Sequence, residues 1–163
     1  MSVSKAGLKA CNYVRMRRYV RVRGCRPSGL PWVAAALVAG GLGLEAADPS
    51  VWDGVYTAEQ TRRGEAAYLS ACASCHGTAL EGGDMTPALV GGAFTSNWND
   101  LTVGDLFDRI RTTMPLDNPG RLSRTQTADV IAFVLKANDW PAGTTELPAD
   151  SALKQIRIAA VKP

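Results

Sequence analysis

Two cysteines and the only histidine of the chain lie within five residues, in the segment CASCH at residues 72–76. Thiols and imidazole bind metals, and thiols also form disulfides and thioethers. Three kinds of site use such a cluster: a redox-active dithiol, a zinc site and a site for covalently attached haem. The sequence around Cys72, Cys75 and His76 has to distinguish among them.

The surroundings of the motif disfavour the first two sites. A thioredoxin-like pair lies near a βαβ unit, whereas a helical pattern precedes this motif and a glycine-rich loop follows it. A structural zinc site takes four ligands, and residues 48–163 contain no other cysteine or histidine. In haem attachment, two thiols at this spacing add to the porphyrin vinyl groups and the next residue ligates the iron. We therefore predict one covalent haem c on Cys72 and Cys75, with His76 as an axial ligand.

A methionine is the expected second axial ligand. Met114 lies at the end of a helical pattern, and Pro115 would stop that helix so that the side chain could turn inward. Met85 follows His76 by nine residues, which leaves little chain to reach the opposite face of a porphyrin. Met114 is therefore the predicted ligand, with an ordinary core methionine as the alternative.

Residues 1–47 are predicted to be an export signal. Residues 1–29 hold eight basic residues and no acidic one, and residues 30–44 form an uncharged apolar run. That run is shorter than the roughly 20 residues that span a bilayer. Cleavage near Ala46 or Ala47 would release the protein into the periplasm, whereas an uncleaved segment would anchor it to the membrane. Met16 is an alternative start, since the residues after it would make an ordinary signal.

Removal of the signal reverses the charge of the protein. The whole chain has a net charge of +3, but residues 48–163 hold ten basic and fourteen acidic residues, a net charge of −4. No basic patch with interleaved aromatics remains, which argues against nucleic-acid binding.

We expect a haem domain at residues 48–138 and a tail at 139–163 that packs on it, with Trp140 and Leu147 as anchors.

Three helices are predicted from their capping residues and apolar faces. Thr57 with Gln60, Thr102 with Asp105, and Ser123 with Gln126 form capping-box patterns. The sequence predicts no strand, and glycines at 77, 82, 83, 91 and 92 predict loops between the first two helices.

With these residues identified, the segment from about 55 to 140 resembles class I cytochrome c. Gly64, Tyr68 and Cys72 follow the family's four-residue rhythm, Val130 and Phe133 fit the helix that packs across the glycine, and Met114 precedes Pro115 as in its axial pair. The resemblance implies an all-α fold with three main helices and loops around one haem. It also implies that the Pro87 carbonyl holds the second ring nitrogen of His76.

One further haem contact is open to two interpretations. Trp98 is either a donor to a haem propionate or a buried structural residue.

The expected function is electron transfer rather than catalysis. Iron held by His76 and Met114 would have no free coordination site, and the sole histidine is already assigned. The expected partners are redox proteins, such as a periplasmic quinoprotein dehydrogenase as donor and a terminal oxidase as acceptor. We expect the protein to be a monomer or to form a transient complex with them. The alternative is a haem protein that binds or senses small gases at an open sixth position.

Overall fold

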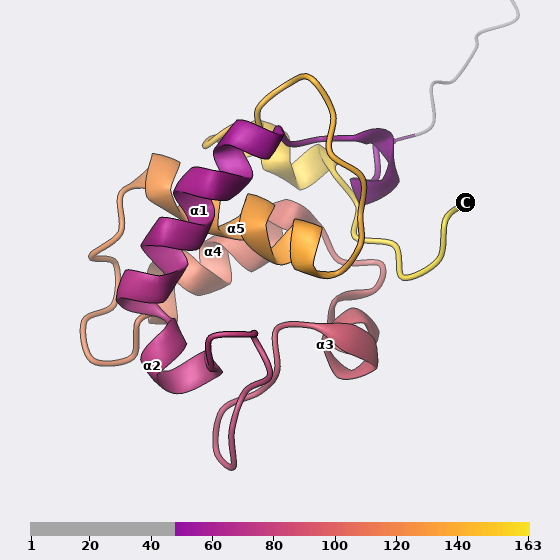
Figure 1. Cartoon of the computed structure of the whole chain (residues 1–163). Helices are drawn as coiled ribbons and strands as arrows, with labels where there is room; N and C mark the ends of the chain where they lie inside the picture. The colour runs from indigo at the N-terminus through magenta and orange to yellow at the C-terminus, as the bar shows by residue number, and fades with distance from the viewer. Residues whose placement is uncertain (1–47) are drawn as a thin grey trace, which may run out of the picture. The chain divides into compact units, whose positions relative to one another are not determined.

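The computed structural model describes residues 48–163, and the predicted export signal at 1–47 lies outside the described residues. These residues form a small all-α fold, with isolated bridges and no strand between 48 and 163 (Figure 1). Within this range no helix is both long and apolar enough to cross a membrane. The elements are η1 (Val51–Asp53), α1 (Ala58–Ala71), α2 (Ala73–His76), α3 (Gly91–Trp98), α4 (Val103–Thr113), α5 (Arg124–Ala137) and η2 (Ser151–Gln155).

The three long helices begin at the predicted caps. The side chains of Thr57, Thr102 and Ser123 each accept a hydrogen bond from the backbone N–H three residues later. The capping box is complete at Thr102 and Ser123, where the third residue also bonds back to the cap. At Thr57 the prediction of a full box was wrong, because the Gln60 side chain bonds the backbone of Leu147 instead.

Helices α1 and α5 cross at Gly64, where their backbones come very close. A Cβ built on Gly64 would lie 1.8 Å from the carbonyl oxygen of Asp129 and 3.1 Å from Cβ of Phe133. One turn further along α1, the ring of Tyr68 packs on that of Phe133, with centroids 5.3 Å apart. Only glycine permits this approach, so Gly64 determines how tightly the helix pair packs.

The region between the motif and α4 is more ordered than the sequence predicts. Gly91 and Gly92 were expected to lie in a loop, but they begin α3. Gly91 has a φ of +75°, which glycine adopts without strain, and its N–H donates to the side chain of Asn138. Phe94 is buried and packs with Trp98 at the end of the helix, with centroids 6.2 Å apart. Burial of this apolar side therefore stabilises a helix despite its two glycines.

The last 25 residues belong to the same core as the helices. Trp140, Leu147, Leu153, Ile156 and Ile158 are all buried. Backbone bonds join this tail to residues 49–51 and to residues 100–103 before and at the start of α4. The indole N–H groups of Trp52 and Trp140 both donate to the carbonyl of Ala159, at 3.0 and 3.1 Å.

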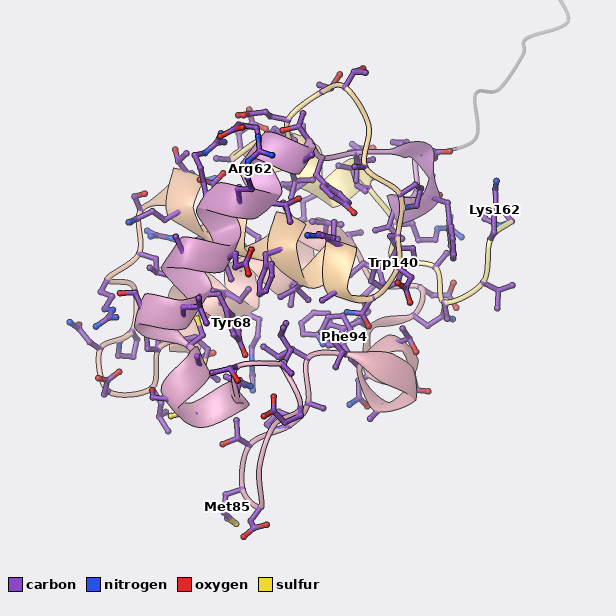
Figure 2. All side chains as sticks on the ribbon, viewed as in Figure 1. Arg62, Tyr68, Met85, Phe94, Trp140 and Lys162 are labelled. Carbon is purple, nitrogen blue, oxygen red and sulfur yellow. The ribbon has the colours of Figure 1, made fainter. Side chains whose placement is uncertain are left out.

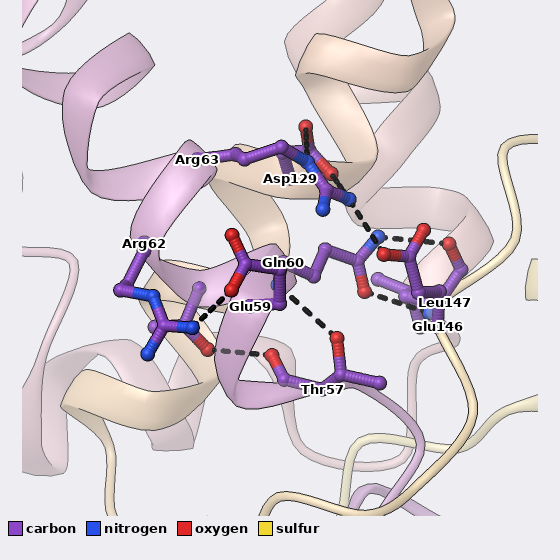
Figure 3. A network of polar contacts seen from close by, with 9 residues as sticks. Thr57, Glu59, Gln60, Arg62, Arg63, Asp129, Glu146 and Leu147 are labelled. Carbon is purple, nitrogen blue, oxygen red and sulfur yellow. Dashed lines mark hydrogen bonds and ion pairs between the residues drawn. The ribbon is translucent and has the colours of Figure 1, made fainter.

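A polar network ties the tail to the first turns of α1 and α5 (Figure 3). The amide of Gln60 is buried and pairs with both the N–H and the carbonyl of Leu147, at 2.7 and 3.0 Å. Arg63 forms two 3.1 Å bonds with Asp129 and one of 2.9 Å with Glu146. These carboxylates raise the pKa of the Arg63 guanidinium further above its usual range. The network joins three separate segments at one end of the molecule.

Candidate haem-binding site

The cysteine–histidine motif forms a short turn of helix at the end of α1. Cys72 is both the C-cap of α1 and the N-cap of α2. Its carbonyl accepts hydrogen bonds from the N–H groups of Cys75 and His76, at 3.1 and 2.9 Å. Gly77, with a φ of +79°, ends α2 and turns the chain into the loop that follows. We call residues 77–90 the motif loop.

The two thiols are free and differ in exposure. Cys72 is partly buried and Cys75 is exposed. Burial raises the pKa of the Cys72 thiol, while the guanidinium of Arg121 opposes that rise. Within residues 48–163 no group of three His, Cys, Asp or Glu side chains converges as a metal site would require. Cys72, Cys75 and His76 are too few ligands for a structural zinc site, but they are compatible with a larger group that is held at several separate points.

The histidine is held by a backbone carbonyl. The His76 side chain is 8% exposed, and its Nδ1 lies 3.0 Å from the carbonyl oxygen of Pro87. Because a carbonyl only accepts, Nδ1 must carry the proton, which leaves Nε2 as the nitrogen that can ligate a metal. This contact is the one that the resemblance implied for Pro87.

The motif loop is folded back onto the histidine by its own backbone bonds. The N–H of Gly82 donates to the carbonyl of His76 at 2.8 Å, and Gly83 and Thr86 pair at the tip of the loop. The hydroxyl of Tyr68, on α1, donates to the carbonyl of Gly77 at 2.7 Å. Burial, with smaller contributions from Cys72 and Glu81, raises the pKa of Tyr68 to about 12, so the phenol keeps its proton at neutral pH.

The two downstream methionines lie in very different environments. Met114 is the partly buried C-cap of α4, where an extended backbone ends the helix. Met85 is 96% exposed at the tip of the motif loop, and Figure 2 shows its side chain pointing away from the helices. Exposure to this degree makes Met85 a poor candidate for a ligand in the core.

Trp98 fits the structural interpretation as well as the functional one. It is the last residue of α3 rather than part of a loop, it is partly buried, and its ring packs on Phe94. Its assignment as a donor to a haem propionate therefore stays a prediction.

The contacts of two polar residues at the site were not predicted from the sequence. Arg121 donates to the carbonyl of Ser70 at 3.4 Å, which joins the loop after Met114 to the last turn of α1. Asn138 caps α5 and bonds both the carbonyl of Leu89 and the N–H of Gly91, at 2.9 and 3.0 Å. An Asn at the end of a helical pattern is a recognisable cap signal, but its partners 47 and 49 residues away could not be read from the sequence.

The donor set fits covalently bound haem c. Two unlinked thiols, an imidazole with its Nε2 available and a thioether on a separate segment are the groups that such a haem requires. The Pro87 contact adds the outer hydrogen bond that usually orients a ligating histidine.

Comparisons with known proteins give two matches. Residues 59–134 match the model of the family described as cytochrome c oxidase, cbb3-type, subunit III. A chain of the sulfane dehydrogenase SoxCD from Paracoccus pantotrophus is 30% identical, with 61% of this chain and 59% of that chain covered and a TM-score of 0.40. The match therefore spans less than two thirds of that chain's length. No match is found among curated proteins.

Proposed function

Because the chain is a c-type cytochrome with covalently bound haem c that serves electron transfer, we propose that it is an electron carrier whose iron is ligated by His76 and Met114. In this proposal the protein performs no bond chemistry of its own. The observation that carries it is the bond between His76 Nδ1 and the Pro87 carbonyl, which leaves Nε2 as the ligating nitrogen.

Each residue of the site has a defined task in this proposal. Haem c, when bound, supplies a one-electron couple at its iron. Cys72 and Cys75 would hold the porphyrin through thioethers, and His76 and Met114 would both ligate the iron, which would keep small molecules off the metal. A thioether ligand and a surrounding of apolar side chains both favour ferrous iron, so we expect a high reduction potential.

The place of the protein in a redox chain is also a proposal. The basic and apolar pattern of residues 1–47 supports export to the periplasm. A dehydrogenase, such as a periplasmic quinoprotein enzyme, would be the donor, and a terminal oxidase would be the acceptor. The family that matches residues 59–134 is named for an oxidase subunit, which supports an acceptor of that kind. Weak, short-lived docking would suit a carrier.

Visible spectroscopy tests the ligand set, with Met85→Ala as the matched control for Met114→Ala. The proteins would be produced with a haem-attachment system and measured oxidised, reduced, and reduced under carbon monoxide. We expect the wild type and Met85→Ala to be low-spin and, when oxidised, to show the weak far-red band of a methionine–ferric iron bond. Their reduced spectra should not change under carbon monoxide. Met114→Ala is expected to lose that band and to bind carbon monoxide.

Two results would contradict the proposal. A wild-type protein that binds carbon monoxide readily would have an open sixth position, and would instead be a gas-binding haem protein. Loss of the far-red band in Met85→Ala, with the band unchanged in Met114→Ala, would show that Met85 and not Met114 is the ligand.

A further inference from the structure

The motif loop is attached to the rest of the protein at both ends by side chains of the α1–α5 pair. At its start, the Tyr68 hydroxyl of α1 bonds the carbonyl of Gly77 at 2.7 Å. At its end, the Asn138 amide at the cap of α5 bonds the carbonyl of Leu89 and the N–H of Gly91. The loop between these two points carries Pro87, whose carbonyl holds His76.

Both attachment points belong to the helix pair. Tyr68 is 0% exposed, and its ring packs on that of Phe133 of α5, with centroids 5.3 Å apart. Asn138 is fixed by a third bond, from its amide to the carbonyl of Val134 in the last turn of α5. The positions of these two polar groups are therefore set by the helix pair and not by the loop.

The loop transmits these positions to the histidine through short backbone contacts. Gly77 is bonded to His76 through the peptide link, and the carbonyl of His76 accepts from Gly82 at 2.8 Å. Leu89 donates to Leu80 at 2.8 Å, which joins the two arms of the loop on either side of Pro87. A shift at Gly77 or Leu89 must therefore move the Pro87 carbonyl relative to the imidazole.

We propose that Tyr68 and Asn138 are positioning residues that clamp the two ends of the motif loop and so hold the Pro87 carbonyl on Nδ1 of His76. This inference rests on the proposed function, in which His76 ligates the iron. An acceptor on Nδ1 makes the imidazole a stronger donor to a metal. The clamp therefore affects the iron without touching it.

Removal of one hydroxyl tests the clamp. Tyr68→Phe keeps the ring and deletes the bond to Gly77, and Tyr56→Phe is the matched control. Tyr56 is equally buried, and its hydroxyl also donates to a backbone carbonyl, that of Trp140 in the tail. The two variants should lose similar amounts of stability, because each loses one buried hydrogen bond.

The readouts are the solvent exchange of the His76 Nδ1 proton, followed by NMR in the reduced holoprotein, and the reduction potential. In Tyr68→Phe we expect the exchange to become roughly two- to tenfold faster, from the usual net strength of one hydrogen bond. The potential should rise, since a weaker imidazole donor stabilises ferric iron less. Tyr56→Phe should leave both unchanged. Asn138→Ala should behave as Tyr68→Phe does, and it decides the matter alone if Tyr68→Phe does not fold.

The outcomes separate this inference from the proposed function. A wild type in which His76 does not ligate the haem iron would overturn the proposed function, and the clamp with it. A correctly ligated wild type whose exchange and potential are unchanged in Tyr68→Phe and Asn138→Ala would overturn the clamp alone. Equal changes in Tyr56→Phe and Tyr68→Phe would also overturn it, because they would show a general loss of stability.

Discussion

The two ends of the α1–α5 pair are completed in different ways. The tail end comprises residues 57–63 of α1, the start of α5 and residues 139–163, and its polar groups are satisfied by the chain itself, as at Gln60 and Arg63. The motif end comprises residues 72–90 and 114–123, where the four-residue helix α2 and its N-cap carry the two unlinked thiols of Cys75 and Cys72. At the tail end, the chain's own residues supply the partners of the polar groups. The motif end instead presents side chains that can bind a haem, which the chain itself does not supply.

The largest expected effect comes from removing the attachment points of that group. Cys72→Ala combined with Cys75→Ala should abolish covalent haem and leave the amides of residues 72–90 and 114–123 unprotected from hydrogen exchange. The amides of the α1–α5 crossing and of the tail should stay better protected than those of residues 72–90 and 114–123, because their contacts do not involve the motif. Mass spectrometry of exchanged peptides would give this comparison.

Equal protection at the two ends of this double variant would contradict the comparison. It would mean that the motif end is as complete without its haem as the tail end is. The single variant Cys75→Ala is a useful intermediate, since Cys75 is the more exposed thiol and Cys72 keeps one possible thioether.

Gly64→Ala should be the most damaging change at the crossing between the two ends. The new methyl group would lie 1.8 Å from a backbone oxygen of α5, which cannot rotate away. We expect a loss of about 3 kcal/mol in the free energy of unfolding, as in severe overpacking. Gly92→Ala is the control: its added Cβ would meet nothing within 4 Å, and it should stay within about 1 kcal/mol of the wild type in chemical denaturation.

Gln60→Ala tests whether the tail end is independent of the haem. The change leaves the N–H and the carbonyl of Leu147 without their buried partner, so we expect a loss of about 2 kcal/mol. The visible spectrum and the reduction potential of the folded protein should stay the same. A shifted potential in Gln60→Ala would show that the two ends are coupled and would weaken the comparison.

The smallest expected effect is an acid dependence of stability at the contact between α4 and the tail. Bonds from Thr102, and then from Lys154 of η2, lower the pKa of Asp105 to about 2. Because this pKa is depressed on folding, its stabilising contribution is present above about pH 4 and is lost as the pH falls through 2. Asp105→Asn should reduce that loss by about 0.5 kcal/mol, since the carboxylate is partly exposed and screened. Urea unfolding at pH 5 and pH 3 would measure it, and an equal pH dependence in the variant would refute the assignment.

Much of the helical framework could be predicted because its signals are local. Thr102 and Ser123 lie within four residues of the partners that complete their caps, and the apolar faces of α4 and α5 repeat at helical spacing. The prediction failed at α3, where Gly91 and Gly92 suggested a loop. There the helix is stabilised by burial of Phe94 and by the distant side chain of Asn138, and neither is visible in a local window.

The candidate site was predictable where the motif is contiguous and less so where it depends on tertiary contacts. Cys72, Cys75 and His76 follow directly from their spacing, and Pro87 followed from the resemblance and then bonded His76 in the structure. The partners of Arg121 and Asn138 could not be predicted, because they are 51 and up to 49 residues away in the sequence. Gln60 carried a misleading signal, since one side chain could serve either a cap or the tail.

The most direct test of the account is the mass of one peptide from the protein produced with a haem-attachment system. Trypsin cleaves after Arg63 and Arg109, which releases residues 64–109 with both cysteines and the histidine on one peptide. The account predicts that this peptide carries a single haem and contains no free thiol. A peptide with two free thiols, or with a disulfide between Cys72 and Cys75 and no haem, would contradict it.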